Sequence, residues 1–288
     1  ELVCERRFVA TDYRMTSPGR ASWELVMTAW IPLTGDGPFP TMIFGHGINS
    51  DRRMADEAVD ALRGLGVVVV SVDAVAHGDH LTSEGLSGYE GVLTLLGIDA
   101  MAIEVDGRKM RDNFLQSSFD KLQLVELLKR DGDLDQDGLN DVDSDALGYI
   151  GLSLGAIMGS QVLALSKDMK VSALVTPGAR LTDILAYADR MSMVLTILDG
   201  ITGSRDATFE ALSAVQTATD PGDAVAFAGH VLTDRLNDAP APHILAMQVI
   251  GDNTVPATTT RALTWALGLP QMTPVVEPIP MVEQLGGP

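Results

Sequence analysis

The five residues 151–155, which read Gly-Leu-Ser-Leu-Gly, constrain the fold of this chain more than any other part of the sequence. They join the apolar run 147–152 to the segment 154–165, whose small residues allow a helix to pack closely on a sheet. A strand that turns sharply into a helix has no room for side chains beside its central residue, which explains the flanking glycines. We therefore predict a strand, a tight turn and a helix here, with Ser153 as a candidate nucleophile.

Around this motif, short β-rich runs alternate with helix-length segments, a pattern typical of a mostly parallel sheet flanked by helices. The run Val67–Val70 suits a strand buried on both faces. Since 46% of the 288 residues are hydrophobic, we predict one α/β domain spanning 1–288. Strands are predicted at 23–33, 41–44, 66–73, 147–152, 171–176, 243–250 and 274–279, and helices at 51–65, 109–129, 154–165 and from Pro256.

Two segments do not fit this simple alternation. Residues 81–102 mix Gly, Ser and Leu without a clean period, and we interpret them as an excursion above the sheet rather than a core element. Residues 180–238 are helical in pattern and rich in Leu, Met and Ala. We predict that they form a helical cap with an apolar pocket beneath it, because insertions of this length in compact domains are usually functional. The alternative is an additional helical layer of the core.

A serine hydroxyl needs donors for the oxyanion that develops during its attack. Residues 45–48 read Gly-His-Gly-Ile at the end of a predicted strand, a loop that can turn a backbone N–H toward the site. We predict the amides of Ile48 and Leu154 as the oxyanion hole. The side chain of His46 is interpreted as structural.

A carboxylate is needed to orient the imidazole that activates the serine. Asp252 follows the predicted strand 243–250 in the sequence Gly-Asp-Asn-Thr-Val-Pro and is the predicted catalytic acid. The alternative for Asp252 is a turn or helix-capping aspartate before the helix that begins near Pro256. Asp183 is the alternative acid.

Taken in order, the motifs at 45–48, 151–155 and 251–256 resemble those of the α/β-hydrolase superfamily, in particular bacterial secreted esterases and lipases. The resemblance runs from Trp23 to the C-terminus and implies an α/β-hydrolase fold and hydrolysis of carboxylic esters through an acyl-enzyme on Ser153. Residues 111–116, with the cap after them, are similar to the virulence-factor type of lipase. Another acyl hydrolase, such as a peptidase, or an acyltransferase remains an alternative.

One departure from the family pattern concerns the general base. The family order is serine, acid, histidine, yet no histidine follows His243 in this sequence. We interpret His77, His80 and His230 as structural or substrate-facing, and His243 as the start of a strand. We therefore expect the base to lie beyond Pro288; if the chain ends there, the alternative is a weak hydrolase or a catalytically silent binding protein of the same fold.

The segment 131–145 places carboxylates on alternate residues and then a glycine, as calcium-binding loops do. The predicted ligands are Asp133, Asp135, Asp137, the carbonyl of Leu139, Asp141 and finally Asp143 or Asp145. Position twelve is Ser144 rather than Glu, so the loop resembles those of extracellular calcium modules. We predict a structural calcium ion that braces the strand leading to Ser153. The alternative is a solvated acidic turn.

Charge and hydropathy narrow the partners further. The net charge of −19 would repel a phosphate backbone, so nucleic acid is not an expected partner. No stretch is apolar enough for a membrane span. Cys4, the single cysteine, is expected to lie half-buried in a strand and forms no internal disulfide. The expected substrate is a small-molecule or lipid ester, without an organic cofactor, and the calcium loop favours a secreted or cell-surface bacterial protein.

Overall fold

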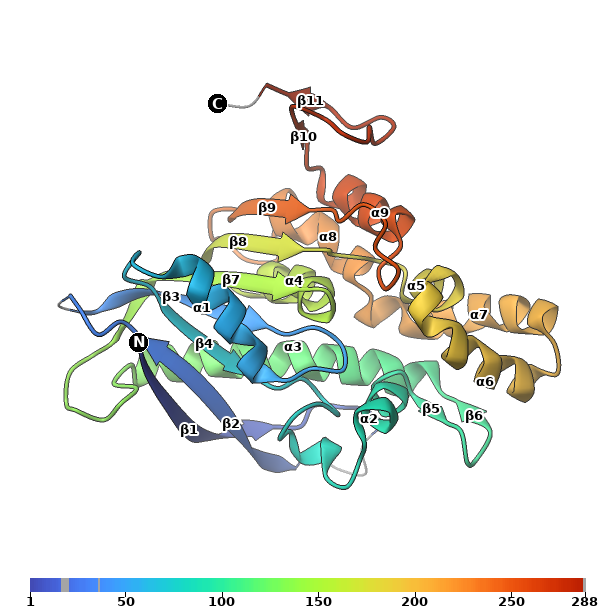
Figure 1. Cartoon of the computed structure of the whole chain (residues 1–288), viewed down its shortest axis with the longest axis horizontal. Helices are drawn as coiled ribbons and strands as arrows, with labels where there is room; N and C mark the ends of the chain where they lie inside the picture. The colour runs from blue at the N-terminus through green and yellow to red at the C-terminus, as the bar shows by residue number, and fades with distance from the viewer. Residues whose placement is uncertain (17–20, 36, 287–288) are drawn as a thin grey trace.

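The computed structural model describes residues 1–16, 21–35 and 37–286. In these residues the main sheet has seven strands in the order β1-β2-β4-β3-β7-β8-β9 (Figure 1). The strands from β4 to β9 run parallel, whereas β1 and β2 are antiparallel to each other and β2 is antiparallel to β4. The bounds are β1 Leu2–Thr11, β2 Ser22–Ile31, β3 Phe39–Gly45, β4 Val68–Val72, β7 Val142–Leu152, β8 Met169–Val175 and β9 His243–Met247.

Helices cover both faces of this sheet, so the predicted fold class is confirmed. One core cluster packs α1 against one face, while the larger cluster joins α3, α4, α8 and α9 to the other. The helices are α1 Ala55–Leu62, α2 Gly88–Leu95, α3 Gly107–Arg130, α4 Leu154–Leu165, α5 Leu181–Tyr187, α6 Ser192–Thr202, α7 Arg205–Thr219, α8 Ala224–Leu232 and α9 Ala257–Leu267. Single turns of 3₁₀-helix occur at η1 Arg52–Met54, η2 Leu81–Ser83, η3 Asp189–Met191 and η4 Asp220–Gly222.

Strand β4 shows why the valine run predicted a central strand. All five of its residues are buried. Val68, Val70 and Val72 belong to the larger core cluster, whereas Val69 packs with α1 on the opposite face. Alternating side chains of one strand therefore serve both layers of helices.

The segment 81–102 contains a core helix, so the prediction of a simple excursion was wrong. Helix α2 begins with a capping box, in which Ser87 and Glu90 each bond the other's backbone N–H. Its residues Val92 and Leu95 join the larger core. A short hairpin of β5 Ile98–Asp99 and β6 Glu104–Val105 follows. Glycines at both ends of α2 interrupt the apolar period, so the sequence pattern did not indicate a helix.

The prediction of a last strand at 274–279 was also wrong. These residues form no strand, and the two-residue strands β10 Gln271–Met272 and β11 Gln284–Leu285 instead pair in parallel as a separate small sheet. Figure 1 shows this pair projecting beyond β9, away from the main sheet. Pro274 and Pro278 have no backbone N–H to donate, so this stretch is poorly suited to a sheet interior. In the described residues, β1 and β9 are the two edges of the main sheet.

The residues 180–238 between β8 and β9 are helical throughout most of their length. Helices α5, α6 and α7 extend beyond the carboxyl ends of the parallel strands (Figure 1). Helix α8 packs instead against α4 and α9. None of the described helices is both long enough and apolar enough to cross a bilayer.

Candidate active site

Ser153 occupies the sharp turn between β7 and α4. Its backbone angles are φ 52° and ψ −110°, a combination that residues with a side chain rarely adopt. The amide of Ser153 donates to the carbonyl of Val175 on β8 at 2.9 Å, which anchors the turn to the neighbouring strand. The side chain is therefore held above the carboxyl edge of the sheet at the N-terminus of a helix, as the sequence motif predicts.

Glycines on both sides of Ser153 allow this turn to pack against the end of β3. A Cβ atom on Gly155 would overlap the backbone of Gly45, and one on Gly151 would lie 2.6 Å from the carbonyl oxygen of Gly155. The hydroxyl of Tyr149 donates to that same carbonyl oxygen at 2.6 Å in a fully buried position. The turn is thus supported from beneath by a side chain that the sequence did not single out.

The loop after β3 lies directly beside the serine. The carbonyl of His46 accepts a hydrogen bond from the amide of Gly155 at 2.9 Å, and a Cβ on Gly47 would lie 3.8 Å from the Cβ of Ser153. Among the described residues, the backbone amides of Ile48 and Leu154 have no hydrogen-bond acceptor. These two amides are the predicted oxyanion donors, and both residues line the cavity that contains Ser153.

The ring of His46 is fixed in one neutral form. Its Nε2 accepts a hydrogen bond from the amide of Ala74 at 2.9 Å, so the proton sits on Nδ1, which donates to the carbonyl of Gly47 at 2.8 Å. Burial, with His77 as the next cause, lowers the pKa of His46 to about 3. Both ring nitrogens are occupied, so His46 holds the loops after β3 and β4 together and has no free nitrogen to serve as a base.

The other histidines are engaged or remote as well. His77 donates from Nδ1 to the carbonyl of Val75 at 3.0 Å, and burial lowers its pKa. His80 contacts the carboxylate of Asp120 at 3.3 Å in the protein interior.

His230 and His243 lie outside the site as well. His230 lies on α8, where its Nδ1 contacts the carbonyl of Asp234 at 2.6 Å. His243 begins β9 and so lies at the amino ends of the parallel strands, whereas Ser153 follows the carboxyl end of β7. No hydrogen bond joins any of these histidines to Ser153, and the buried Nε2 of His77 has no partner among the described residues.

Asp252 lies in the loop between β9 and α9. Its Oδ1 accepts the amides of Thr254 at 2.7 Å and Val255 at 3.0 Å, so it serves as a turn aspartate before the helix. The side chains of Thr254 and Val255 line the same cavity as Ser153, which places this loop at the site. Asp183, the alternative acid, lies in the first turn of α5 and pairs with Arg180 at 2.9 Å.

The cavity at Ser153 is small and almost entirely apolar. Its volume is about 30 Å³. The lining residues come from the oxyanion loop, α2, α3, α4, α5, η3 and the loop after β9: Ile48, Leu96, Phe114, Ser153, Leu154, Ile157, Leu181, Ile184, Leu185, Met191, Thr254 and Val255. Sequence patterns identified Ser153, Ile48 and Leu154, and the predicted cap contains Met191. Phe114 was expected only as an apolar position of a helix, and Leu96 lay in the segment interpreted as an excursion from the core.

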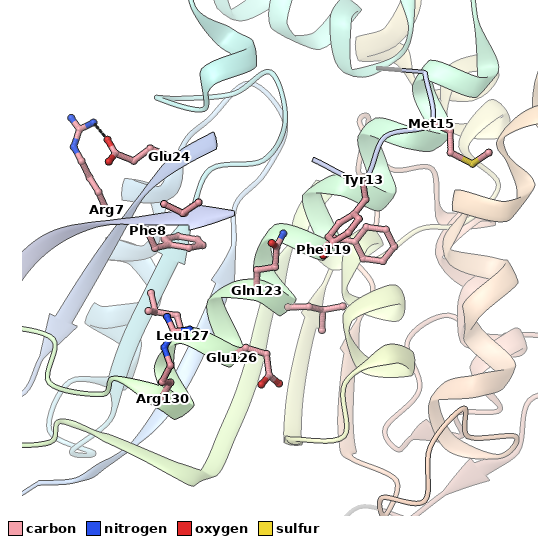
Figure 2. A pocket seen from close by; sticks show the side chains of 12 residues that line it. Arg7, Phe8, Tyr13, Met15, Glu24, Phe119, Gln123, Glu126, Leu127 and Arg130 are labelled. Carbon is pink, nitrogen blue, oxygen red and sulfur yellow. Dashed lines mark hydrogen bonds and ion pairs between the residues drawn. The ribbon is translucent and has the colours of Figure 1, made fainter. Parts of the chain in front are cut away.

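A much larger groove of about 1,010 Å³ lies between β1 and α3. Figure 2 shows its side chains, with Phe8 on the strand and Phe119 and Gln123 on the helix. Tyr13 meets Phe119 edge-on, with ring centroids 5.7 Å apart. The groove shares no lining residue with the cavity at Ser153 and contains no candidate nucleophile of the predicted type.

A buried ion-pair network behind the oxyanion loop was not predicted from the sequence. Arg52 on η1 is 1% exposed and donates to Asp73 at 2.7 Å, Asp79 at 2.8 Å and Glu5 at 2.9 Å. Its Nε also donates to Thr28 at 2.9 Å. These contacts join η1 to β1, β2 and the end of β4. In the sequence, Arg52 follows the loop and Asp73 ends a buried strand, but neither position indicates which residue it pairs with.

The acidic loop brings together some of the predicted calcium ligands. Carboxylate oxygens of Asp133, Asp135 and Asp141 lie within 4.8 Å of one another. Burial raises the pKa of Asp141, and repulsion from Asp135 and Asp137 adds to this effect. A cation among these oxygens would offset that repulsion, so the donor set fits a hard divalent ion such as calcium.

The remaining predicted ligands lie outside this group of three carboxylates. Asp137 uses Oδ1 to accept the amide of Leu139 at 2.8 Å. Asp143 accepts the amide of Asp145 at 3.0 Å, and Asp145 is exposed on β7.

The loop is also attached to the first strand of the sheet. Arg6 pairs with Asp131 at 2.7 Å and donates to the carbonyl of Asp133 at 2.7 Å. The half-buried Cys4 donates to the carbonyl of Leu134 at 3.4 Å, and the Leu134 side chain is fully buried. The loop therefore braces β1 as well as the start of β7.

Several solved structures are similar to this one at low sequence identity. Acetyl xylan esterase 1 from Thermoanaerobacterium sp. JW/SL YS485 has a TM-score of 0.61 and 16% identity, covering 98% of this chain and 80% of that chain. A puromycin-hydrolyzing peptidase from Mycobacterium tuberculosis has a TM-score of 0.54 and 13% identity, covering 98% of this chain and 35% of that chain. The acylaminoacyl peptidase of Pyrococcus horikoshii has a TM-score of 0.50 and 14% identity, covering 91% of this chain and 35% of that chain.

No protein-family model and no curated protein sequence matches the chain. The likeness to solved structures therefore concerns the fold. Together with the strand order and the turn at Ser153, it shows that the chain has the α/β-hydrolase fold.

Proposed function

We propose that this protein is a serine hydrolase that cleaves carboxylic esters through an acyl-enzyme on Ser153. The observation that carries the proposal is the strained backbone of Ser153 beside the unpaired amides of Ile48 and Leu154. Strain of this kind persists only where the surrounding structure imposes it, and it clusters at active sites. An apolar cavity that opens at the same serine supplies a place for the acyl group.

In the proposed reaction, the Oγ of Ser153 forms a bond to the ester carbonyl carbon. The carbonyl oxygen gains negative charge, which the amides of Ile48 and Leu154 and the N-terminus of α4 stabilise. The bond to the alcohol then breaks, and the alcohol leaves with the proton that Ser153 gave up. Water attacks the acyl-enzyme, releases the carboxylic acid and restores the serine hydroxyl.

The proton transfers in this scheme need a base held by a carboxylate. Asp252 is the proposed carboxylate, because its Oδ1 is used by two amides while its Oδ2 has no partner among the described residues. The mechanism also requires an imidazole, and no histidine in the structure is hydrogen-bonded to Ser153 or Asp252. This same observation supports the second candidate, a catalytically silent binding protein of the same fold.

Labelling with a fluorophosphonate tests the proposal against this alternative. We expect stoichiometric modification of Ser153 in the full-length protein, mapped by peptide mass spectrometry, and none in Ser153→Ala. Ser160→Ala is the matched control, because Ser160 lies on the same helix and its buried Oγ has no partner among the described residues. Labelling should be unchanged in that variant. An unmodified Ser153 in the full-length protein would reject the hydrolase and support the binding protein.

We also propose that the loop 131–145 binds a structural calcium ion, with Asp133, Asp135 and Asp141 as the central ligands. The convergence of their oxygens and the mutual repulsion at Asp141 support this proposal. The ion would act on stability rather than on the substrate, because the loop braces β1 and β7. A calcium loop of this type suits a secreted or cell-surface protein.

Calcium is expected to raise the melting temperature, measured by calorimetry in excess chelator and then in calcium. At a calcium concentration of about 100 times Kd the stabilisation is about 2.7 kcal/mol, which corresponds to a shift of about 5 °C or more. Asp135→Asn should abolish most of the shift, whereas Asp238→Asn, an exposed aspartate outside the loop, should retain it. An equal shift in wild type and Asp135→Asn would exclude this site.

A further inference from the structure

The cavity at Ser153 has the composition of an acyl-binding site. Ser153 and Thr254 supply the only side-chain hydroxyls among its lining residues, and the rest of the lining is apolar. A sugar or peptide portion of a substrate would leave its polar groups unpaired there, whereas a hydrocarbon chain would not. Since both oxyanion donors border the cavity, a carbonyl group at Ser153 would direct its acyl substituent into it.

The size of the cavity sets a limit on that substituent. One water-sized group needs about 10–15 Å³ of such volume, so about 30 Å³ holds roughly two or three non-hydrogen atoms. A methyl or ethyl group beyond the carbonyl fits this space. A chain of six or eight carbons exceeds this space, so its end would have to displace the lining or extend out of the cavity into solvent.

Much of the lining of the cavity belongs to the closely packed core. Phe114 on α3 and Leu185 on α5 are each 2% exposed, and Leu96 is 4% exposed. All three belong to the larger hydrophobic core, so displacing any of them would disturb packing on both sides. Close-packed interiors resist the insertion of extra methylene groups, at about 1–3 kcal/mol.

We propose that the substrates are esters of short acyl groups, with acetyl and propionyl as the preferred chains, and that Leu185 and Met191 set the length limit. This inference rests on the proposed function of Ser153. It narrows the expected substrate, a small-molecule or lipid ester, to an ester of a short acyl chain. The alcohol portion of the substrate lies outside the cavity and is not restricted by it.

The test is a series of p-nitrophenyl esters from acetate to octanoate, assayed by kcat/KM on the full-length protein. We expect acetate and propionate to be the best substrates and kcat/KM to fall about 10-fold or more by hexanoate, since each misfitting methylene in a rigid pocket has a strong effect. Rates for octanoate equal to those for acetate would reject the short-chain pocket while leaving the hydrolase intact. Failure of every ester, together with an unlabelled Ser153, would reject the proposed function itself.

Enlarging the cavity should change the preference in a defined way. Leu185→Ala is expected to raise the hexanoate to acetate ratio of kcat/KM about 10-fold or more. Leu198→Ala on α6 removes the same atoms from another buried position that does not line the cavity, and it should leave the ratio unchanged. Met191→Ala provides a second enlargement if Leu185→Ala does not fold. If the hexanoate to acetate ratio of kcat/KM stayed unchanged in both Leu185→Ala and Met191→Ala, these residues would not set the length limit and the proposal would be overturned.

Discussion

Replacing Gly155 by alanine is expected to lower the free energy of unfolding by about 3 kcal/mol or more and to abolish labelling of Ser153. The added Cβ would overlap the carbonyl and Cα atoms of Gly45, which are backbone atoms and cannot rotate away. Relief would require α4 to move off β3, and that movement would break the bond from the Gly155 amide to His46. Urea unfolding and fluorophosphonate labelling measure the two effects.

Gly200→Ala is the matched control, because it should raise the free energy of unfolding where Gly155→Ala lowers it. Gly200 is an exposed residue of α6, and a Cβ built there meets no atom within 4 Å. Alanine at such a position stabilises a helix by about 0.5–1 kcal/mol. A Gly155→Ala protein as stable as the wild type would contradict the close crossing of α4 over β3.

Arg52→Met is expected to destabilise the protein by about 3–5 kcal/mol, the usual effect of removing one partner from a buried ion pair. The substitution leaves the carboxylate of Asp73, which is 2% exposed, without its guanidinium partner. Because Arg52 also joins η1 to β1 and β2, the oxyanion loop should become less ordered. Urea unfolding at pH 7 measures the loss.

The adjacent arginine provides the control for this variant. Arg53 is 55% exposed and contacts Glu5 at 3.1 Å, so Arg53→Met should change stability by less than about 1 kcal/mol. If Arg52→Met and Arg53→Met lowered the free energy of unfolding equally, burial of the Arg52 network would not contribute to stability.

The stability difference between wild type and Arg52→Met should also depend on pH. Hydrogen bonding to Arg52 lowers the pKa of Glu5 and of Asp79 in the folded protein. A lowered folded pKa contributes stability that is present above the unfolded pKa and is lost as pH falls through the folded value. The stability that ionised Glu5 and Asp79 contribute in the wild type is therefore lost below about pH 4.5. Arg52→Met lacks most of this contribution at any pH. The difference should be largest near neutral pH and smaller in acid.

Features encoded in short segments could be predicted from the sequence. The turn at Ser153 depends on glycines within two residues of it, and the valine run of β4 identifies a strand whose faces are both buried. The position of Ile48 beside the serine followed from a loop motif at the end of a strand. In each case, the physical requirement and the residues that satisfy it are close together in the sequence.

Features that join distant segments could not be predicted in the same way. Arg52 meets Glu5 across 47 residues of sequence and Asp73 across 21. The wall of the cavity combines Leu96 and Phe114 with α5, and no local pattern in the sequence indicates that these segments meet. The strand predicted at 274–279 does not form, because Pro274 and Pro278 have no backbone N–H to donate to a neighbouring strand.

The origin of the cavity wall has a consequence for how such an enzyme could evolve. The proposed nucleophile and oxyanion donors are held by β3, β7 and α4, whereas Leu185 and Met191 come from the segment inserted between β8 and β9. Mutations in the insertion can therefore alter substrate range while the reactive backbone stays unchanged. Under the proposed function, substitutions at Leu185 or Met191 would give a lineage new acyl preferences without any change in β3, β7 or α4.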